Sequence, residues 1–138
     1  MSGKTYVEQG ETAPASQIGA TLEALAATIA ARRGAGAESY TFRLLSGNPD
    51  AALKKVMEEA GEVALAAKDV EASGEEDGPA VDHLRYEAAD VVYHLLVVLE
   101  RYHIGIDELA AELNERMTAQ ERPHGGVHLH KEDINRGK

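Results

Sequence analysis

The sequence predicts an all-α fold, a four-helix-type bundle that oligomerisation completes. The chain of 138 residues abounds in Ala and Leu, with one Phe and no Trp, which suits packed helices better than a sheet. Apolar residues recur at helical spacing in four segments, with Gly and Pro between them. The length fits one domain with a real core and is too short for two.

The first predicted helix begins near Thr21, whose hydroxyl can cap it. Its apolar stripe is formed by Leu22, Leu25, Ala26, Ile29 and Ala30. Gly34 and Gly36 end the helix. Residues 1–17 are polar and show no periodicity, which predicts a flexible N-terminal tail.

The second predicted helix follows a connector, residues 38–47, that we expect to be part loop and part short helix. Asn48 supplies its cap, Pro49 stands in the first turn, and Asp50 suits the helix dipole. Its predicted buried stripe contains Leu53, Val56, Met57, Ala60, Val63, Ala64 and Ala67. The acidic, Gly- and Pro-containing segment 73–79 ends the helix.

The third predicted helix spans about residues 80–102 and is apolar almost all round after Asp90. A helix without a polar face is buried on every side, which in so short a chain predicts cover by another subunit. After a turn at Gly105, Asp107 and Glu108 open a fourth helix. Its apolar residues are Ile106, Leu109, Ala110, Leu113 and Met117.

The segment from Arg122 onward lacks periodicity and predicts a C-terminal tail, residues 122–138, behind a domain of residues 18–121. The net charge of −10 argues against nucleic-acid backbones and anionic membranes as partners. Without cysteine, neither a disulfide nor a thiolate site is possible. With no signal-like pattern or membrane-length apolar run, we expect a cytoplasmic location.

Two acidic clusters predict a functional site. Glu58, Glu59 and Glu62 lie on one face of the second helix, and Glu87 and Asp90 on one face of the third. Stacked like charges repel, and a divalent cation between the helices would turn that repulsion into attraction. Carboxylate oxygens favour Mg²⁺, with Mn²⁺ as a second possibility, and Mg²⁺ points to phosphate chemistry.

Other readings of these residues are simpler. Lys54 and Lys55 precede the first cluster by one turn, so that cluster alone could be a solvated face with ion pairs. The second cluster decides for a site, because carboxylates at the edge of a buried helix are costly unless paired or metal-bound. His94 fits a core residue or a partner of Asp90. We assign no role at the site to His124, His128 and His130, which belong to the predicted C-terminal tail.

The same residues carry a resemblance to a known family. The pattern Glu58-Glu59-x-x-Glu62, followed by Glu87-x-x-Asp90, resembles the all-α, MazG-like nucleotide pyrophosphatases. Ser39-Tyr40-Thr41, Lys55-Val56 and the run Tyr93-His94-Leu95-Leu96-Val97 are similar to the phosphoribosyl-ATP pyrophosphatases among them. The match covers about residues 21–117, and Met57 stands where a small residue is expected.

The resemblance implies hydrolysis of phosphoribosyl-ATP to phosphoribosyl-AMP and pyrophosphate, the second step of histidine biosynthesis, in a homodimer or higher oligomer. Its implied metal ligands are Glu59, Glu62, Glu87 and Asp90. Glu58 is implied as a ligand or as the group orienting water, and Glu58, Glu59 and Lys55 as the catalytic set. Substrate contacts are expected from Ser39, Tyr40, Thr41, Arg43 and Lys55, with Arg43, Arg32 or Arg33 near the second phosphate.

Three alternatives remain at this point. A di-iron bundle wants Glu-x-x-His motifs on two helices, and this chain has none. A silent helical interaction module would release no pyrophosphate from any nucleotide. Within the enzyme class, the alternative is a house-cleaning pyrophosphatase of non-standard nucleoside triphosphates.

Overall fold

The computed structural model describes residues 10–12 and 15–128, and all regular structure within these ranges is helical. The helices are α1 (Ile18–Ala31), the short 3-10 helix η1 (Arg32–Gly34), α2 (Tyr40–Ser46), α3 (Pro49–Ser73), α4 (Pro79–Arg101) and α5 (Ile106–Asn114). No strand occurs in the described ranges. The all-α prediction is therefore confirmed.

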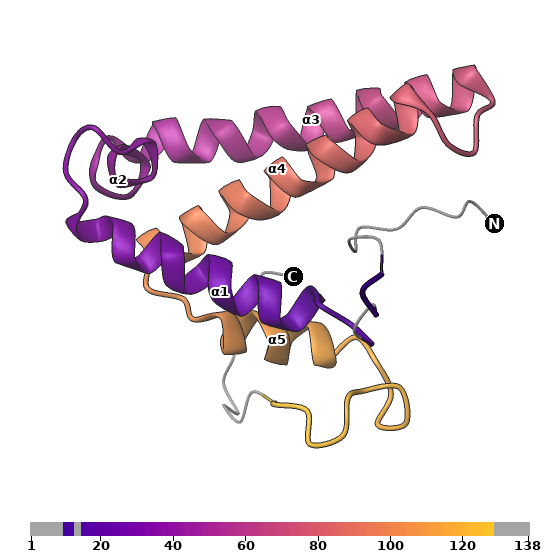
Figure 1. Cartoon of the computed structure of the whole chain (residues 1–138). Helices are drawn as coiled ribbons and strands as arrows, with labels where there is room; N and C mark the ends of the chain where they lie inside the picture. The colour runs from indigo at the N-terminus through magenta and orange to yellow at the C-terminus, as the bar shows by residue number, and fades with distance from the viewer. Residues whose placement is uncertain (1–9, 13–14, 129–138) are drawn as a thin grey trace.

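The helices α3 and α4 form a long antiparallel pair that closes at the 74–78 turn (Figure 1). α2 sits across one end of this pair and contacts both of its helices. α1 packs on α4, and α5 lies beside α1 (Figure 1). The two predicted acidic clusters thus belong to the helices that contact each other most extensively.

Side-chain caps fix where α2 and α3 begin. The Ser39 hydroxyl accepts a hydrogen bond from the Phe42 amide at 3.2 Å. The Asn48 side chain accepts one from the Asp50 amide at 2.9 Å, so the predicted start of the second helix is confirmed. α3 ends at Gly74, whose φ of +66° is a left-handed conformation that glycine adopts without steric cost.

Two predicted helix boundaries were wrong. α1 begins at Ile18, and Thr21 lies inside its first turn because its amide donates to the Gln17 carbonyl at 2.9 Å. A backbone hydrogen bond therefore starts this helix where a side-chain cap was expected. α5 ends at Asn114, so Met117 lies beyond it.

The described part of the segment after α5 folds back on that helix. Arg122 Nε donates to the backbone carbonyl of Asn114 at 2.7 Å, and the side-chain amide of Asn114 donates to the backbone carbonyl of Val127 at 2.9 Å. Asn114 itself is buried. Residues 1–9, 13–14 and 129–138, which hold most of both predicted tails, lie outside the described residues. The division into one domain and two tails stays a prediction.

The core lies where α1, α2 and the start of α3 meet the C-terminal half of α4. Its buried members are Ile29, Leu44, Leu45, Ala52, Leu96 and Val97. Arg101 strengthens this junction by donating to the carbonyls of Leu44, Leu45 and Gly47 at 2.8, 3.0 and 2.7 Å. A cation placed on the last carbonyls of a helix also suits the helix dipole. α2 is therefore held firmly against α4.

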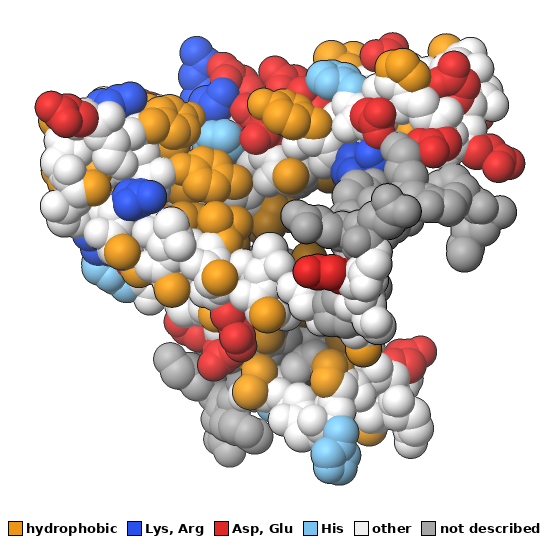
Figure 2. Space-filling view, in the orientation of Figure 1, with side chains coloured by type: hydrophobic (Ala, Val, Ile, Leu, Met, Phe, Trp, Pro, Cys, Tyr) orange, Lys and Arg blue, Asp and Glu red, His pale blue; other side chains and the backbone are white. Residues whose placement is uncertain are grey.

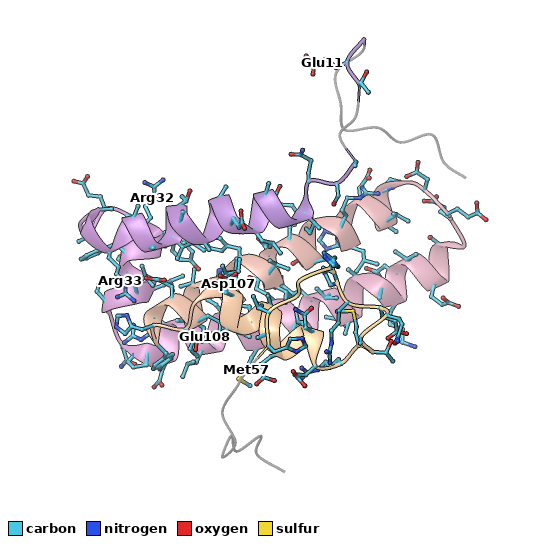
Figure 3. The ribbon with its side chains drawn as sticks, turned by 90° about the horizontal axis from the view of Figure 1, so that it is seen from below. Glu11, Arg32, Arg33, Met57, Asp107 and Glu108 are labelled. Carbon is cyan, nitrogen blue, oxygen red and sulfur yellow. The ribbon has the colours of Figure 1, made fainter. Side chains whose placement is uncertain are left out.

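The apolar stripe predicted to be buried on α3 is largely exposed. Met57 is 76% exposed and lies at the edge of the molecule in Figure 3, and Leu53 is 41% exposed. The buried residues of α3 are Ala52, Glu59 and Ala66, because the face that meets α4 passes through the acidic cluster. On α4, Val92 and Leu95 are also exposed, at 39% and 36%. A single chain leaves this apolar surface uncovered.

Hydrophobic side chains also gather between the helix pair and α1 on the face shown in Figure 2. Charged side chains of both signs lie along the α3 edge of the same view. Within the described ranges, no helix combines the length and the apolar character that crossing a bilayer requires.

Candidate active site

The α3–α4 pair brings Glu59, Glu87 and Asp90 together. One carboxylate oxygen from each of these residues lies within 4.8 Å of the others. Glu59 is 4% exposed and Glu87 is 5% exposed. The antiparallel pairing therefore joins the two acidic clusters that the sequence placed on separate helices (Figure 1).

Two oxygen atoms of this group have no hydrogen-bond partner among the described residues. They are Glu59 Oε2 and Glu87 Oε2, both inaccessible to solvent. A buried carboxylate oxygen without a partner carries an uncompensated desolvation cost, which an adjacent cation removes. Three hard oxygen donors at this spacing suit Mg²⁺ or Mn²⁺.

Glu62 adjoins this group from the exposed side of α3. Hydrogen bonding that a protonated Glu62 gains with the carboxyl groups of Glu87 and Glu59, together with the two negative charges, raises the pKa of Glu62 to about 7. Burial contributes least to this shift, in agreement with the exposure of the side chain. Near neutral pH, Glu62 is therefore only partly ionised.

Lys55 neutralises part of the negative charge. Its Nζ lies 2.9 Å from a carboxylate oxygen of Glu59 and 3.6 Å from one of Glu58. The hydrogen bond with Glu59 raises the pKa of Lys55, and the same bond lowers the pKa of Glu59. Glu59 therefore stays ionised and Lys55 stays charged at neutral pH.

Glu58 lies outside the compact carboxylate group. It is exposed and pairs with Lys54 at 3.5 Å and with Lys55 at 3.6 Å. On the other helix, His83 approaches Glu87 at 3.5 Å. The structure thus separates Glu58 from the carboxylates that gather between the helices, and leaves it at the rim beside two lysines.

Residues of the connector contact side chains of α4 that lie next to the site. The Tyr40 hydroxyl lies 3.0 Å from His94 Nε2, and His94 Nδ1 lies 2.8 Å from the backbone carbonyl of Asp90. The Thr41 hydroxyl hydrogen-bonds the Tyr93 hydroxyl. Sequence reasoning proposed His94 as a partner of Asp90 and Tyr40 as a substrate contact, but it missed the Tyr40–His94 and Thr41–Tyr93 contacts, because only the docked α2 brings these residues together.

Tyr40 is a connector residue whose pKa responds to the charged groups of the site. Partial burial raises the pKa of its hydroxyl, the positive charge of Lys55 opposes that rise, and the charges of Glu59 and Asp90 add to it. Tyr40 as a residue is 43% exposed, which places it at the rim of the site.

The other candidate residues have mainly local partners. Ser39 caps α2. Arg43 donates to the carbonyls of Ala37 and Glu38 at 2.8 and 3.1 Å, and its guanidinium lies 5.9 Å from the centre of the Tyr40 ring. Arg33 pairs with Glu100 at 2.8 Å, near the junction of η1 and α4 (Figure 3).

The contacts seen for the described tail histidines are local to their own segment, the one that follows α5. His124 is exposed, and His128 lies 3.2 Å from Glu115 and 3.3 Å from Arg122. His130 lies outside the described residues.

Comparison with known proteins identifies the family. A family model described as "Phosphoribosyl-ATP pyrophosphohydrolase" matches residues 22–117. The phosphoribosyl-ATP pyrophosphatase of Paracidovorax citrulli is 42% identical over 108 residues, which cover 75% of each chain. That of Methylobacterium radiotolerans is 48% identical over 101 residues, covering 72% of this chain and 85% of the relative.

A third relative is longer. The histidine biosynthesis bifunctional protein HisIE of Halalkalibacterium halodurans is 43% identical over 102 residues, which cover 74% of this chain and 43% of the relative. No solved structure gives a significant match to this chain.

Proposed function

The chain belongs to the phosphoribosyl-ATP pyrophosphohydrolase family, and on that premise we propose that it hydrolyses phosphoribosyl-ATP to phosphoribosyl-AMP and pyrophosphate. This reaction is the second step of histidine biosynthesis. The observation that supports a hydrolytic site is the group Glu59, Glu87 and Asp90 with its two unpartnered buried oxygens. The relatives' names give no support to the house-cleaning alternative.

The proposal includes a divalent cation, Mg²⁺ or Mn²⁺, held by Glu59, Glu87 and Asp90, with Glu62 as fourth ligand after loss of its proton. The unpartnered oxygens and the 4.8 Å spacing fit such an ion. When bound, the cation would neutralise charge on the phosphate oxygens and align them. The protein supplies a fixed frame, because α4 is anchored to α2 just beyond Asp90.

The residues at the rim would handle the substrate. Lys55 is charged and lies beside Glu59, where it can meet a phosphate oxygen of the triphosphate. Glu58 lies outside the carboxylate group and can accept a proton from the attacking water. The hydroxyl-bearing connector, including Tyr40, borders the same rim and is proposed to contact the nucleotide.

A pyrophosphate-release assay tests this function. Phosphoribosyl-ATP and a panel of nucleoside triphosphates are compared with Mg²⁺, with Mn²⁺ and in thorough chelator. We expect release from phosphoribosyl-ATP that depends on the cation. Undiminished activity in chelator would remove the metal proposal. Faster turnover of deoxynucleoside triphosphates would favour the house-cleaning function, and no release from any nucleotide would favour a silent interaction module.

We further propose that the active form is a homodimer or higher homo-oligomer. The support is the uncovered apolar surface of the helix pair, which includes Met57, Val92 and Leu95. Contact with a second copy would remove this surface from water.

A further inference from the structure

A chain of two hydrogen bonds links α4 to the rim of the site. It starts at the backbone carbonyl of Asp90, passes through the ring of His94, and ends at the Tyr40 hydroxyl, with distances of 2.8 and 3.0 Å. His94 is 6% exposed, and the rings of Tyr40 and Tyr93 meet it edge-on. The imidazole is thus fixed in place and orientation.

The first bond sets the direction of the second. A carbonyl oxygen only accepts, so His94 Nδ1 must carry a hydrogen and donate it to Asp90. In the neutral imidazole, Nε2 is then an acceptor. Whenever the ring carries its single hydrogen on Nδ1, the proton of the Tyr40 hydroxyl points to His94 Nε2, and the lone pairs of the Tyr40 oxygen remain available.

We propose that His94 is a positioning residue that holds Tyr40 as a hydrogen-bond acceptor at the rim of the site, where Tyr40 receives an O–H donor. That donor is a ribose hydroxyl of the nucleotide or a water molecule held for the reaction. A phosphate oxygen has no proton to give at neutral pH. Tyr40 therefore contacts a sugar hydroxyl or a water molecule and not a phosphate group. This inference rests on the proposed hydrolysis and deepens it.

The ring-nitrogen state of His94 gives a test that needs no measurement of turnover. Heteronuclear NMR of ¹⁵N-labelled protein, recorded above pH 7.5, reports which nitrogen carries the hydrogen. We expect the Nδ1-protonated tautomer, and Tyr40→Phe should shift the Nε2 resonance by removing its donor. A hydrogen on Nε2 would overturn the proposal, because Tyr40 would then be free to donate elsewhere.

A double-mutant cycle tests whether His94 acts through Tyr40. Tyr40→Phe and His94→Leu are each expected to lower kcat/KM roughly twofold to tenfold, the effect of one neutral hydrogen bond. The double variant should be no worse than Tyr40→Phe alone. Additive losses would overturn the proposal and assign His94 to Asp90 or to the core. His94→Gln restores an acceptor, so it should lose less activity than His94→Leu.

Controls separate this inference from folding and from the proposed function. Tyr102→Phe changes an exposed tyrosine at the end of α4 and should leave kcat and KM unchanged. Thermal melts show whether each variant folds. If the wild-type chain prefers another triphosphate, the proposed function fails, yet the cycle is still measured on that triphosphate.

The split between KM and kcat distinguishes the two donors. If a ribose hydroxyl is bound, Tyr40→Phe raises KM, and the variant no longer distinguishes ATP from 2′-deoxy-ATP or 3′-deoxy-ATP as competitive inhibitors. If water is held, kcat falls and the discrimination between these inhibitors is unchanged. Unchanged kcat, KM and discrimination would overturn the proposal.

Discussion

Glu62 differs from the other carboxylates of the site, because it is exposed and yet has a pKa of about 7. The cause is its pair of hydrogen bonds to Glu87 and Glu59, whose charges it faces. The folded state therefore binds a proton that the unfolded chain releases above about pH 4.5, the ordinary value for a glutamate. A cation at the site would compete with this proton.

The first prediction concerns stability and pH. Since the folded pKa of Glu62 is raised, its contribution to stability is complete below about pH 4.5 and is lost as pH rises through about 7. In chelator, the melting temperature of the wild type should fall between pH 5.5 and pH 8 more than that of Glu62→Gln. Mg²⁺ should reverse the fall at pH 8. Equal pH dependence in both proteins would contradict this assignment of the proton.

The second prediction concerns the metal ligands. Asp90→Asn should reduce turnover by at least about tenfold to a hundredfold, since even residues that only support a ligand cause losses of that size. The fold should survive, because the Asp90 backbone carbonyl still receives the His94 hydrogen bond. Circular dichroism and Mn²⁺ titration measure fold and affinity. Normal Mn²⁺ affinity in the variant would remove Asp90 from the ligand set.

The third prediction concerns selectivity. Phosphoribosyl-ATP carries a phosphate that ATP lacks. The Arg43 guanidinium lies beside the Tyr40 ring, and the hydrogen bonds to the carbonyls of Ala37 and Glu38 use only its Nη1. Arg43→Ala should raise KM for phosphoribosyl-ATP and leave slow ATP hydrolysis unchanged. Arg116→Ala, on an exposed arginine just past α5, is the matched control. An equal loss on both substrates would place Arg43 at the triphosphate.

At the scale of elements, local chemistry explains why some boundaries were predictable. The caps at Ser39 and Asn48 and the breaker Gly74 act within a few residues, so the sequence alone indicates them. The start of α1 depends on a backbone bond to Gln17, which has no sequence signature. The prediction of which face of α3 is buried was wrong, because the face that meets α4 carries Glu59 and small residues such as Ala52 and Ala66.

The candidate site, like the helix boundaries, could be predicted from the sequence only in part. The spacing of the acidic residues indicated one carboxylate face on each of two helices, with Glu59 on the first and Glu87 and Asp90 on the second. Only the pairing of the helices could show that Glu58 stays outside the group. The Tyr40–His94 bond joins residues 54 positions apart, which no local pattern can encode.

The fourth prediction tests the segment after α5. A chain ending at residue 121 should keep turnover within a few-fold, because Arg122 and Val127 contact α5 and not the carboxylate group. Its melting temperature should fall, since buried Asn114 loses its hydrogen bonds to Arg122 and Val127, each worth about 1 kcal/mol, and keeps the one from the Met117 amide. A chain ending at residue 128 is the control. A large loss of activity with an unchanged melt would assign this segment a role at the site.

At the scale of the whole molecule, the exposed apolar residues of α3 and α4 are the support for the proposed homo-oligomer. The fifth prediction is that Leu95→Glu, on this surface, yields monomers or an insoluble chain, because a charge there opposes burial against another copy. Leu113→Glu is the matched control, since Leu113 is 50% exposed and lies on α5, away from the helix pair. Light scattering and sedimentation at micromolar concentration give the oligomeric state. A well-folded wild-type monomer would contradict the oligomer, and equal dissociation by both variants would place the interface elsewhere than on the α3–α4 surface.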